Sequence, residues 1–308
     1  MIAAIRAVVR TAIYHNLEVY GVERGYDGMI NGKIRRLKTS DVGNIIHRGG
    51  TILKTARSTA FMTPEGRAKA YQSLVSFEID ACVAIGGNGT FTGADLFSKE
   101  YNIPFIGVPG TIDNDLYGTD HTIGFDTAIN TAMEAADKIR DTADSHNRLF
   151  FIEVMGRHAG FIALHSAIGA GAGGVIIPES DETIEDLVDH LKKASKRNKT
   201  FGLIIVAEGS KYGGAEAVAQ KVNAQLPDYD TKVTIIGHMQ RGGSPTCIDR
   251  VLASRLGYEA VGALLEGQKS VMVGIYNNQL SFTSFQDAIY KNKVVNERMM
   301  KMAEILAL

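Results

Sequence analysis

The sequence predicts an α/β fold with two doubly wound parallel-sheet domains. Its 308 residues are enough for about two domains. Hydrophobic residues make up 45% of the chain and charged residues 22%, which is ordinary for a globular protein and excludes disordered and fibrous classes. Short runs rich in Val, Ile and Phe alternate with longer helical patterns, and this alternation is typical of parallel sheets covered by helices on both faces.

Each element follows from its own pattern of apolar residues. Short apolar runs predict strands over 80–85, 104–108, 149–154, 175–177, 201–207, 233–236 and 271–275. Helical spacing predicts helices over 64–75, 92–100, 127–142, 184–195, 215–226 and 245–266. Ile2, Ile5 and Val9 recur at helical spacing and predict a first helix, not a transit peptide. Ligands in such folds bind beyond the carboxyl ends of the strands, so functional residues are expected in strand-to-helix loops.

Charge and composition exclude several classes of partner. The chain has 33 Lys and Arg against 34 Asp and Glu, which gives no overall attraction to nucleic acid or to an anionic membrane. The uncharged stretch 161–178 contains His165 and several glycines, which argues against a membrane span. Cys82 and Cys247 form no CxxC pattern, which favours a reduced setting. We therefore predict a cytoplasmic protein without a signal peptide.

A glycine-rich loop, Gly86-Gly87-Asn88-Gly89-Thr90, follows a predicted strand and leads into a helix. Glycines let backbone N–H groups approach an anion, and the helix N-terminus adds partial positive charge, so a nucleotide phosphate is the expected ligand. A tight turn without a ligand is the alternative. No GxxxxGK[ST] motif occurs, and the GxGxxG match at 169–174 follows a helix instead of a strand.

A second polar segment, 109–115, follows the next predicted strand. If it is extended, the side chains of Thr111, Asp113 and Asp115 face one space, because alternate residues of an extended chain point the same way. Paired carboxylates beside a phosphate loop suggest a base for a hydroxyl and an anchor for magnesium. Asx-turns are the alternative explanation for these residue types.

Basic residues also occur at loop ends, namely Arg57, Arg148, Arg157 and Arg241. An arginine can make a two-point contact to a phosphate, although a solvated surface arginine is an equal alternative for any one of them. His238 precedes Arg241 in a glycine-containing loop, where it is either functional or a satisfied core histidine. No Ser-His-Asp set, HExxH or cysteine cluster predicts a hydrolytic nucleophile or a bound transition metal.

In combination, these motifs resemble the bacterial ATP-dependent 6-phosphofructokinases along essentially the whole chain. The resemblance also includes Met155-Gly156-Arg157 and the segment 237–245. The resemblance implies transfer of the ATP γ-phosphoryl group to the 1-hydroxyl of fructose 6-phosphate in glycolysis, with Mg²⁺, in a cytoplasmic homotetramer with shared active sites. It also implies two phosphofructokinase-type domains. We expect a larger ATP-binding domain over 1–124 plus 240–290 and a smaller sugar-phosphate-binding domain over 125–239 plus 291–308.

The resemblance assigns roles to individual residues. Asp113 would be the general base, Thr111 and Arg57 would stabilise the transferred group, and Asp115 would support metal and substrate. Nucleotide binding would involve Arg57, Ser58, Gly87, Asn88, Gly89 and Thr90, with Asn88 at the metal. Sugar-phosphate binding would involve Thr111, Asp113, Asp115, Met155, Gly156, Arg157, Glu208, His238 and Arg241, with Arg148 and Lys232 reaching it from a neighbouring subunit. An effector, ADP or phosphoenolpyruvate, would meet Arg6, Arg10, Arg48, Arg140, Arg197 and Lys199.

Several positions separate alternative activities. Gly89 and Gly110 match the ATP users of the family, whereas its pyrophosphate users resemble GGDD and PKTIDND there, so pyrophosphate is the less favoured donor. Asn88 replaces an aspartate that binds magnesium, and Lys232 replaces an arginine; Gly173 stands where an effector-site Glu is frequent. The family pattern also begins with a strand and a glycine loop ahead of the helix that starts this sequence. A weak or silent paralogue that binds sugar phosphate or effector in an assembly is therefore the second hypothesis.

Overall fold

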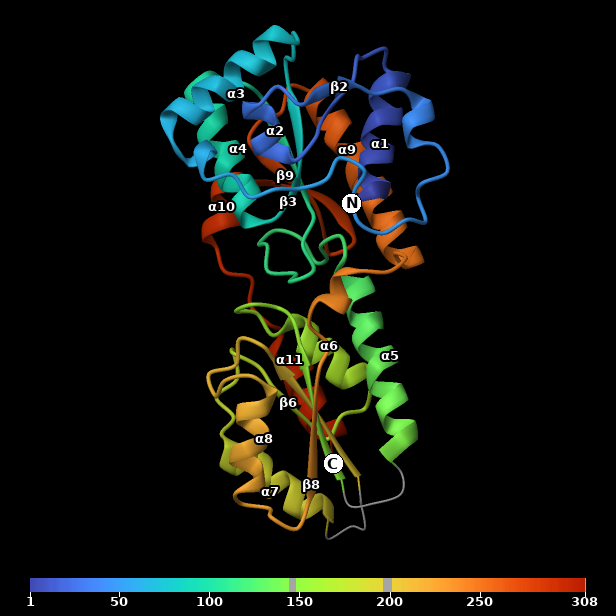
Figure 1. The fold of residues 1–308 in the computed structure, drawn as a ribbon, viewed down its shortest axis with the longest axis vertical. Helices are drawn as coiled ribbons and strands as arrows, with labels where there is room; N and C mark the ends of the chain where they lie inside the picture. The colour runs from blue at the N-terminus through green and yellow to red at the C-terminus, as the bar shows by residue number, and fades with distance from the viewer. Residues whose placement is uncertain (144–147, 196–200, 308) are drawn as a thin grey trace. The chain divides into compact units, whose positions relative to one another are not determined.

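The computed structural model in Figure 1 describes residues 1–143, 148–195 and 201–307. These residues form two compact units. The first contains Met1–Thr111, Leu116–Gly124 and Ser244–Lys293, and the second contains Ile112–Asp115, Phe125–Gly243 and Val294–Leu308. The units depart from the predicted domain boundaries in three places: 112–115 and 240–243 belong to the second unit, and 291–293 belong to the first.

The first unit is built on a mixed sheet with the strand order β10-β9-β4-β3. Strands β3 (Cys82–Gly86), β4 (Phe105–Pro109) and β9 (Val271–Tyr276) run parallel, and β10 (Gln279–Ser284) is antiparallel to β9. Gly86 pairs with Pro109 in register, so the loops that leave β3 and β4 start from the same edge of the sheet.

Helices cover both faces of this sheet (Figure 1). Ile106 and Val108 of β4 pack against one pair of helices, while Phe105 packs on the opposite face. The pair is α1 (Ile2–Tyr14) and α9 (Cys247–Leu265); the opposite layer contains α3 (Pro64–Ser76), α4 (Asn88–Tyr101) and α10 (Phe285–Tyr290). This alternation of buried side chains along the strands is what the doubly wound prediction requires.

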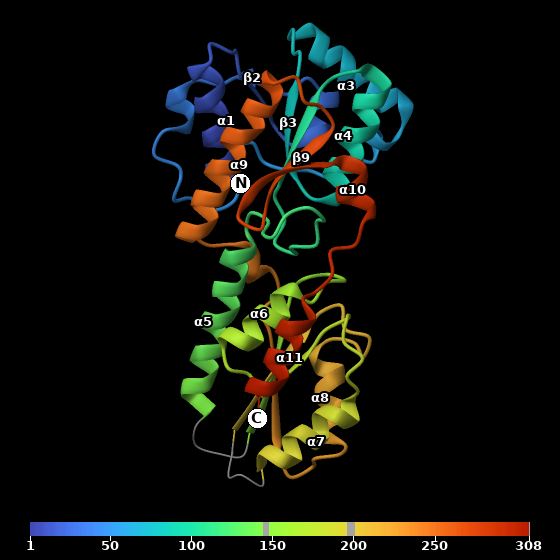
Figure 2. The ribbon, with the colours of Figure 1, turned by 180° about the vertical axis from the view of Figure 1, so that it is seen from behind.

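The second unit has a parallel sheet with the order β6-β7-β5-β8. Its strands are β5 (Arg148–Val154), β6 (Gly174–Ile176), β7 (Phe201–Ala207) and β8 (Asp230–Ile235). Figure 2 shows α5 (Phe125–Ala143), α6 (Phe161–Gly169) and α11 (Glu297–Leu306) on one side of this sheet, and α7 (Ile184–Ser195) and α8 (Ala215–Asn223) on the other. The α/β architecture with parallel strands is therefore confirmed in each unit.

Strand β1 (Tyr20–Val22) lies within the strand-like run 17–22 of the sequence and pairs antiparallel with β2 (Ile34–Arg36). The elements that were not predicted are β2, β10, α10, α11, the helix α2 (Gly25–Ile30), and the 3-10 turns η1 (Thr39–Val42), η2 (Ala60–Met62) and η3 (Gly237–Arg241). The predicted helix start at Thr92 was also wrong, because α4 begins at Asn88. Glycine has low helix propensity, which hides a first turn that contains Gly89. Among the described residues, no helix has the length and apolar character needed to cross a membrane.

Arg67 on α3 is a buried charged residue that hydrogen-bonds to two other elements of the first unit. Only 5% of Arg67 is exposed. Its Nε and Nη2 donate to the two carboxylate oxygens of Glu100 at 2.6 and 2.8 Å, and its Nη1 donates to the carbonyls of Phe61 and Met62 at 3.1 and 2.8 Å. This hydrogen bonding lowers the pKa of Glu100 and ties α3, α4 and η2 to one another.

We expect Arg67→Met to lower the free energy of unfolding by about 2–4 kcal/mol, because the carbonyls and the carboxylate lose their donor in a buried place. Chemical denaturation measures this change. Arg36→Met is the matched control, since Arg36 pairs with Glu18 at 2.6 Å but both side chains are exposed, and its cost should stay below about 1 kcal/mol. Equal losses in the two variants would contradict the role given to Arg67.

Candidate active site

The glycine loop of the first unit joins the end of β3 to the start of α4. Gly110 N–H donates to the Gly86 carbonyl at 2.8 Å, which fixes the loop after β4 against the loop after β3. A side chain at Gly86 would overlap the hydroxyl of Thr90 in the first turn of α4. Only glycine therefore allows the helix to begin this close to the strand.

This loop has the geometry of an anion site. Gly87 is the N-cap of α4, a helix of 14 residues whose N-terminus carries partial positive charge. A Cβ placed on Gly87 would lie 3.5 Å from the Cβ of Thr111, so Thr111 borders the loop. A Cβ on Gly89 would meet nothing within 4 Å, which leaves open space beside the loop. The first unit thus brings Gly87, Gly89, Thr90 and Thr111 together as predicted.

Asn88, Arg57 and Ser58 are the remaining residues that the sequence predicts to bind the nucleotide. Asn88 is the first residue of α4, and its amide oxygen is the type of ligand that a hard cation accepts. Among the described residues, no cluster of three His, Cys, Asp or Glu could hold a metal ion. Mg²⁺ bound together with phosphates needs only one or two protein ligands, so the loop fits a metal that arrives with its anion. Arg57 is exposed, while Ser58 Oγ accepts from the Phe61 N–H at 3.3 Å.

Asp113 is the most perturbed acid in the predicted set. It belongs to the second unit and is only 4% exposed. Burial raises the pKa of its carboxyl, and the neighbouring charge of Asp115 raises it further, whereas Arg241 and Arg157 oppose the shift. The Arg157 Nε lies 3.7 Å from the Asp113 Oδ2. A carboxylate whose pKa is raised towards neutrality is a stronger base, and such shifts are common at catalytic positions.

The prediction that 109–115 is an extended segment was wrong. The chain bends at Ile112 and Asp113, and Asn114 has φ of 53°, in the left-handed region. The bend lets Ile112 enter the hydrophobic core of the second unit while Asp113 and Asp115 remain within electrostatic range of each other. A bend followed by a left-handed asparagine, a conformation that Asn tolerates, is therefore the better description of this backbone.

Glu208 shapes the loop that follows β5. The backbone N–H groups of Gly156 and Arg157 donate to its Oε1 at 3.1 and 2.7 Å. Gly156 has φ of 145° and Arg157 has φ of 54°, a reversal that glycine accommodates at the first position. Because Glu208 follows β7, which pairs with β5, the carboxyl ends of these strands meet as the parallel topology predicts. Arg157 itself is exposed, and its head is directed at Asp113.

The loop that follows β8 contributes His238 and Arg241, both exposed, on the 3-10 turn η3. Gln240 anchors this turn and was missed by the sequence analysis. It is 1% exposed, and its Oε1 accepts from the Met155 N–H at 2.7 Å. In the sequence, Gln240 is a lone uncharged polar residue between Met239 and Arg241. Such a position does not reveal whether the side chain is buried and hydrogen-bonded or exposed to solvent. Asp113, Asp115, Met155, Gly156, Arg157, Glu208, His238 and Arg241 all belong to the second unit.

Arg148 and Lys232 lie elsewhere in the second unit. Arg148 starts β5 and Lys232 is near the start of β8, whereas Met155 follows the end of β5. At about 3.3 Å per residue, Arg148 is about 20 Å from Met155 along the strand. Both cations pair with Asp230, Arg148 Nε at 3.3 Å and Lys232 Nζ at 2.7 Å. The structure therefore separates these two residues from the other sugar-phosphate candidates of their own chain.

The predicted effector residues do not form one group within either unit. Arg6 and Arg10 lie on α1 and Arg48 follows η1, all in the first unit. Arg140 belongs to α5 in the second unit, where its guanidinium donates to the Ala170 carbonyl. Arg197 and Lys199 fall outside the described residues.

Comparison with known proteins gives consistent matches. The family model for phosphofructokinase matches residues 1–264. ATP-dependent 6-phosphofructokinase of Cytophaga hutchinsonii is 56% identical over 306 residues, covering 99% of this chain and 93% of the relative. ATP-dependent 6-phosphofructokinase 2 of Bacteroides thetaiotaomicron is 51% identical, covering 100% of this chain and 94% of the relative.

A solved structure shares the whole fold. The crystal structure of Pichia pastoris phosphofructokinase in the T-state aligns with a TM-score of 0.88 at 33% identity, covering 99% of this chain. This chain spans only 37% of that longer chain.

The charges around Asp113 predict opposite titration shifts in two variants. Asp115→Asn should lower the pKa of Asp113, because a negative neighbour is removed, and Arg241→Gln should raise it, because a positive neighbour is removed. Carboxyl carbon NMR of aspartate-labelled protein, recorded against pH, measures both shifts. Asp228→Asn, at an exposed turn, serves as the control. Shifts of the same sign in the two variants would refute the electrostatic assignment.

Proposed function

The chain belongs to the phosphofructokinase family, and we propose that it transfers the γ-phosphoryl group of MgATP to the 1-hydroxyl of fructose 6-phosphate, giving fructose 1,6-bisphosphate in glycolysis. The observation that carries this proposal is the pairing of a glycine anion loop, bordered by Thr111, with the buried carboxyl of Asp113 two residues along the chain. Phosphoryl transfer depends mainly on positioning and charge neutralisation, for which such groups suffice.

In this proposal, different residues accept the proton, stabilise the transferred group and bind the phosphoryl donor. Asp113 accepts the proton of the sugar hydroxyl as that oxygen attacks phosphorus, and its raised pKa suits it to that role. Thr111 and Arg57 stabilise negative charge on the moving group, and Asp115 helps to orient the substrate. MgATP supplies the phosphoryl group and, through its metal ion, neutralises charge on the phosphates. Asn88, Ser58, Gly87, Gly89 and Thr90 bind this donor.

The second unit offers the chemistry of a sugar-phosphate site. Arg157 and Arg241 are exposed cations, each able to make a two-point contact with a phosphate. His238 adds a third donor beside Arg241. Glu208 holds the Gly156–Arg157 turn through two backbone hydrogen bonds, which keeps Arg157 in place. We assign Met155 to the wall of the same site.

The choice of donor rests on two small residues. Open space around Gly89 leaves room for the inner phosphates of a nucleotide, which a carboxylate there would repel. A Cβ at Gly110 would lie 3.1 Å from Ile85 and 3.4 Å from the Gly86 nitrogen, so a lysine there would crowd the loop. These features support ATP over pyrophosphate, in agreement with the ATP-dependent relatives.

We further propose a homotetramer in which neighbouring subunits share active sites. Arg148 and Lys232 lie too far along the sheet to reach the sugar-phosphate residues of their own chain, which supports their use by a neighbour. Val233 and Ile235 are exposed on β8, the end strand of its sheet within the described chain, and offer apolar surface for such a contact. A cytoplasmic location belongs to the same proposal, and the free thiols Cys82 and Cys247 are compatible with it.

Effector binding is part of this proposal. Arg6 and Arg10 lie one helical turn apart on α1 and suit a phosphate of ADP or phosphoenolpyruvate. Arg48 and Arg140 would contribute further charge, after Arg140 releases its contact with the Ala170 carbonyl.

Asn88 favours a second candidate function, a weakly active paralogue that binds sugar phosphate or effector within an assembly, because a neutral amide attracts Mg²⁺ less than a carboxylate does.

Asp113→Asn tests the catalytic assignment. It should lower kcat by about 10²–10⁴-fold, because general base catalysis contributes that much, while the KM for ATP changes little. A coupled assay of fructose 1,6-bisphosphate formation, with fructose 6-phosphate and Mg²⁺, measures the rate with ATP and, in parallel, with pyrophosphate as the donor. Asp228→Asn, exposed on the surface, is the control and should retain full activity. Turnover that survives in Asp113→Asn would reject the assignment, and an inactive native chain would favour the second candidate.

Asn88→Asp tests the metal assignment. It should tighten the binding of Mg²⁺-nucleotide by about tenfold, because a carboxylate adds a charged ligand. Calorimetric titration with MgADP measures the affinity, and ADP without Mg²⁺ is the control, which should bind no better. Unchanged MgADP affinity would place Asn88 away from the metal.

A further inference from the structure

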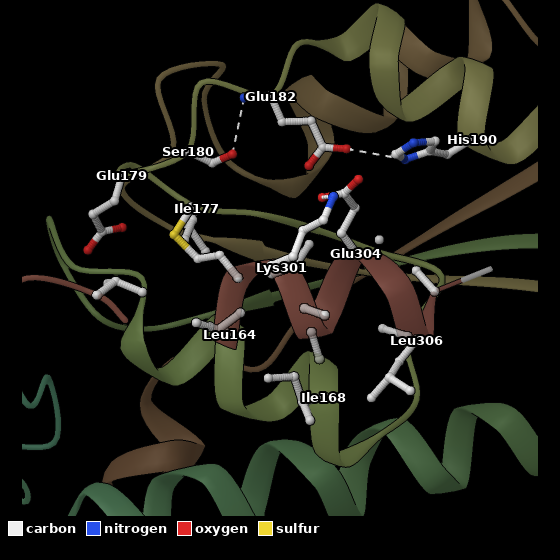
Figure 3. Close-up of a pocket in the computed structure, with 18 of the residues that line it drawn as sticks. Leu164, Ile168, Ile177, Glu179, Ser180, Glu182, His190, Lys301, Glu304 and Leu306 are labelled. Atoms are coloured by element: carbon white, nitrogen blue, oxygen red, sulfur yellow. Dashed lines mark hydrogen bonds and ion pairs between the residues drawn. The ribbon is translucent and has the colours of Figure 1, made fainter. Parts of the chain in front are cut away.

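A cavity of about 690 Å³ lies within the second unit, apart from all residues assigned to phosphoryl transfer or sugar-phosphate binding. Its walls come from α6, the segment 171–182 around β6, the start of α7, and α11. This volume is in the range of sites that enclose small organic molecules, about 300–1,000 Å³. Figure 3 shows the side chains that line it.

The cavity has an apolar floor and an acidic wall. The floor is formed by Leu164, Ile168, Ile177, Met300 and Leu306. The lining carries six carboxylates against one lysine and one histidine: Glu179, Asp181, Glu182, Asp186, Glu297 and Glu304, with Lys301 and His190. An apolar body with a positive end is the ligand that such a lining complements.

Three of these carboxylates already have partners, whereas Glu182 is the one whose pKa is raised. Glu304 pairs with Lys301 at 2.8 Å. Asp186 accepts from Thr183 at the start of α7, and Glu179 accepts from the Gly160 N–H. Glu182 has His190 Nδ1 at 3.6 Å, and Figure 3 shows its carboxyl and that of Glu304 pointing toward each other.

Glu182 is therefore the carboxylate whose ionisation a bound cation would change most. Burial raises its pKa to about 7, with the charges of Asp186 and Glu304 adding to the effect. The charged groups around it are Asp186 and His190 from α7, Glu297, Lys301 and Glu304 from α11, Glu179 and Asp181 from its own loop, and Lys211, which donates to the Ser180 carbonyl. A bound cation would favour the ionised carboxylate and release a proton near neutral pH.

The arrangement suits an organic cation better than a metal ion. Within 1–143, 148–195 and 201–307, no group of three His, Cys, Asp or Glu is close enough to hold a metal. The apolar floor adds contact area that a hydrated metal ion does not use. We propose that this cavity binds a small protonated amine, whose ammonium group lies between Glu182 and Glu304 and whose apolar body lies on the floor of the cavity.

Three probes of equal size test the proposal on the full chain: phenethylamine, phenethyl alcohol and phenylacetate. Calorimetric titration at about pH 8, above the pKa of Glu182, should give an affinity for the amine at least about tenfold higher than for the alcohol, and no binding of the carboxylate. The amine should bind more weakly at about pH 6, because Glu182 is then protonated. Equal affinities for amine and alcohol, or no binding of the amine, would overturn the proposal.

Two variants with opposite expected effects on the affinity for phenethylamine distinguish a change in binding from a general loss of folding. Glu182→Gln should lower the affinity for phenethylamine by about tenfold and remove its pH dependence. Lys301→Met should raise the affinity, because it removes a competing cation whose side chain is 64% exposed. Glu134→Gln, an exposed carboxylate on α5 that pairs with Lys138, is the matched control and should change nothing. Unaltered amine binding in both Glu182→Gln and Lys301→Met would refute the site.

Discussion

The parallel pairing of β3 with β4 is the constraint that positions the glycine loop of the first unit. Gly86 and Pro109 lie in register, and the Gly110 N–H donates to the Gly86 carbonyl where the two strands end. This contact places the glycine loop beside Thr111. The chain then continues through a bend to Asp113, so a backbone hydrogen bond between the two strand ends helps to fix the start of this segment.

The second unit uses the same principle with different residues. Parallel pairing of β5 with β7 and β8 brings the loops after these strands to one edge of the sheet. Glu208 and Gln240 then fasten the loops through backbone N–H groups, at Gly156, Arg157 and Met155. The loops that carry the outward-facing cations are therefore held by acceptors on other side chains, the half-buried Glu208 and the buried Gln240. This arrangement leaves Arg241 exposed, while the Arg157 Nε faces the Asp113 Oδ2 at 3.7 Å.

The sequence predicted more of the regular structure than of the connections. Strands with uniform apolar runs, such as 201–207, and amphipathic helices, such as Ile184–Ser195, were confirmed because their periodicity is set by burial alone. The bend at Ile112–Asp113 was missed, since its left-handed residue, Asn114, has several favoured conformations and only packing of Ile112 selects one. Gln240 and the acidic cavity around Glu182 depend on contacts between distant segments, which periodicity does not reveal.

Strand β8 has a consequence for handling the isolated chain. Within the described residues it closes one side of its sheet, with Val233 and Ile235 exposed and an edge of backbone groups turned outward. Such an edge is a template on which another chain can add a strand and start an aggregate. Asp230 and Lys232, at the beginning of the strand, oppose that addition because charged side chains disfavour flat stacking. Neutralising Lys232 would thus remove a safeguard against fibril-like association.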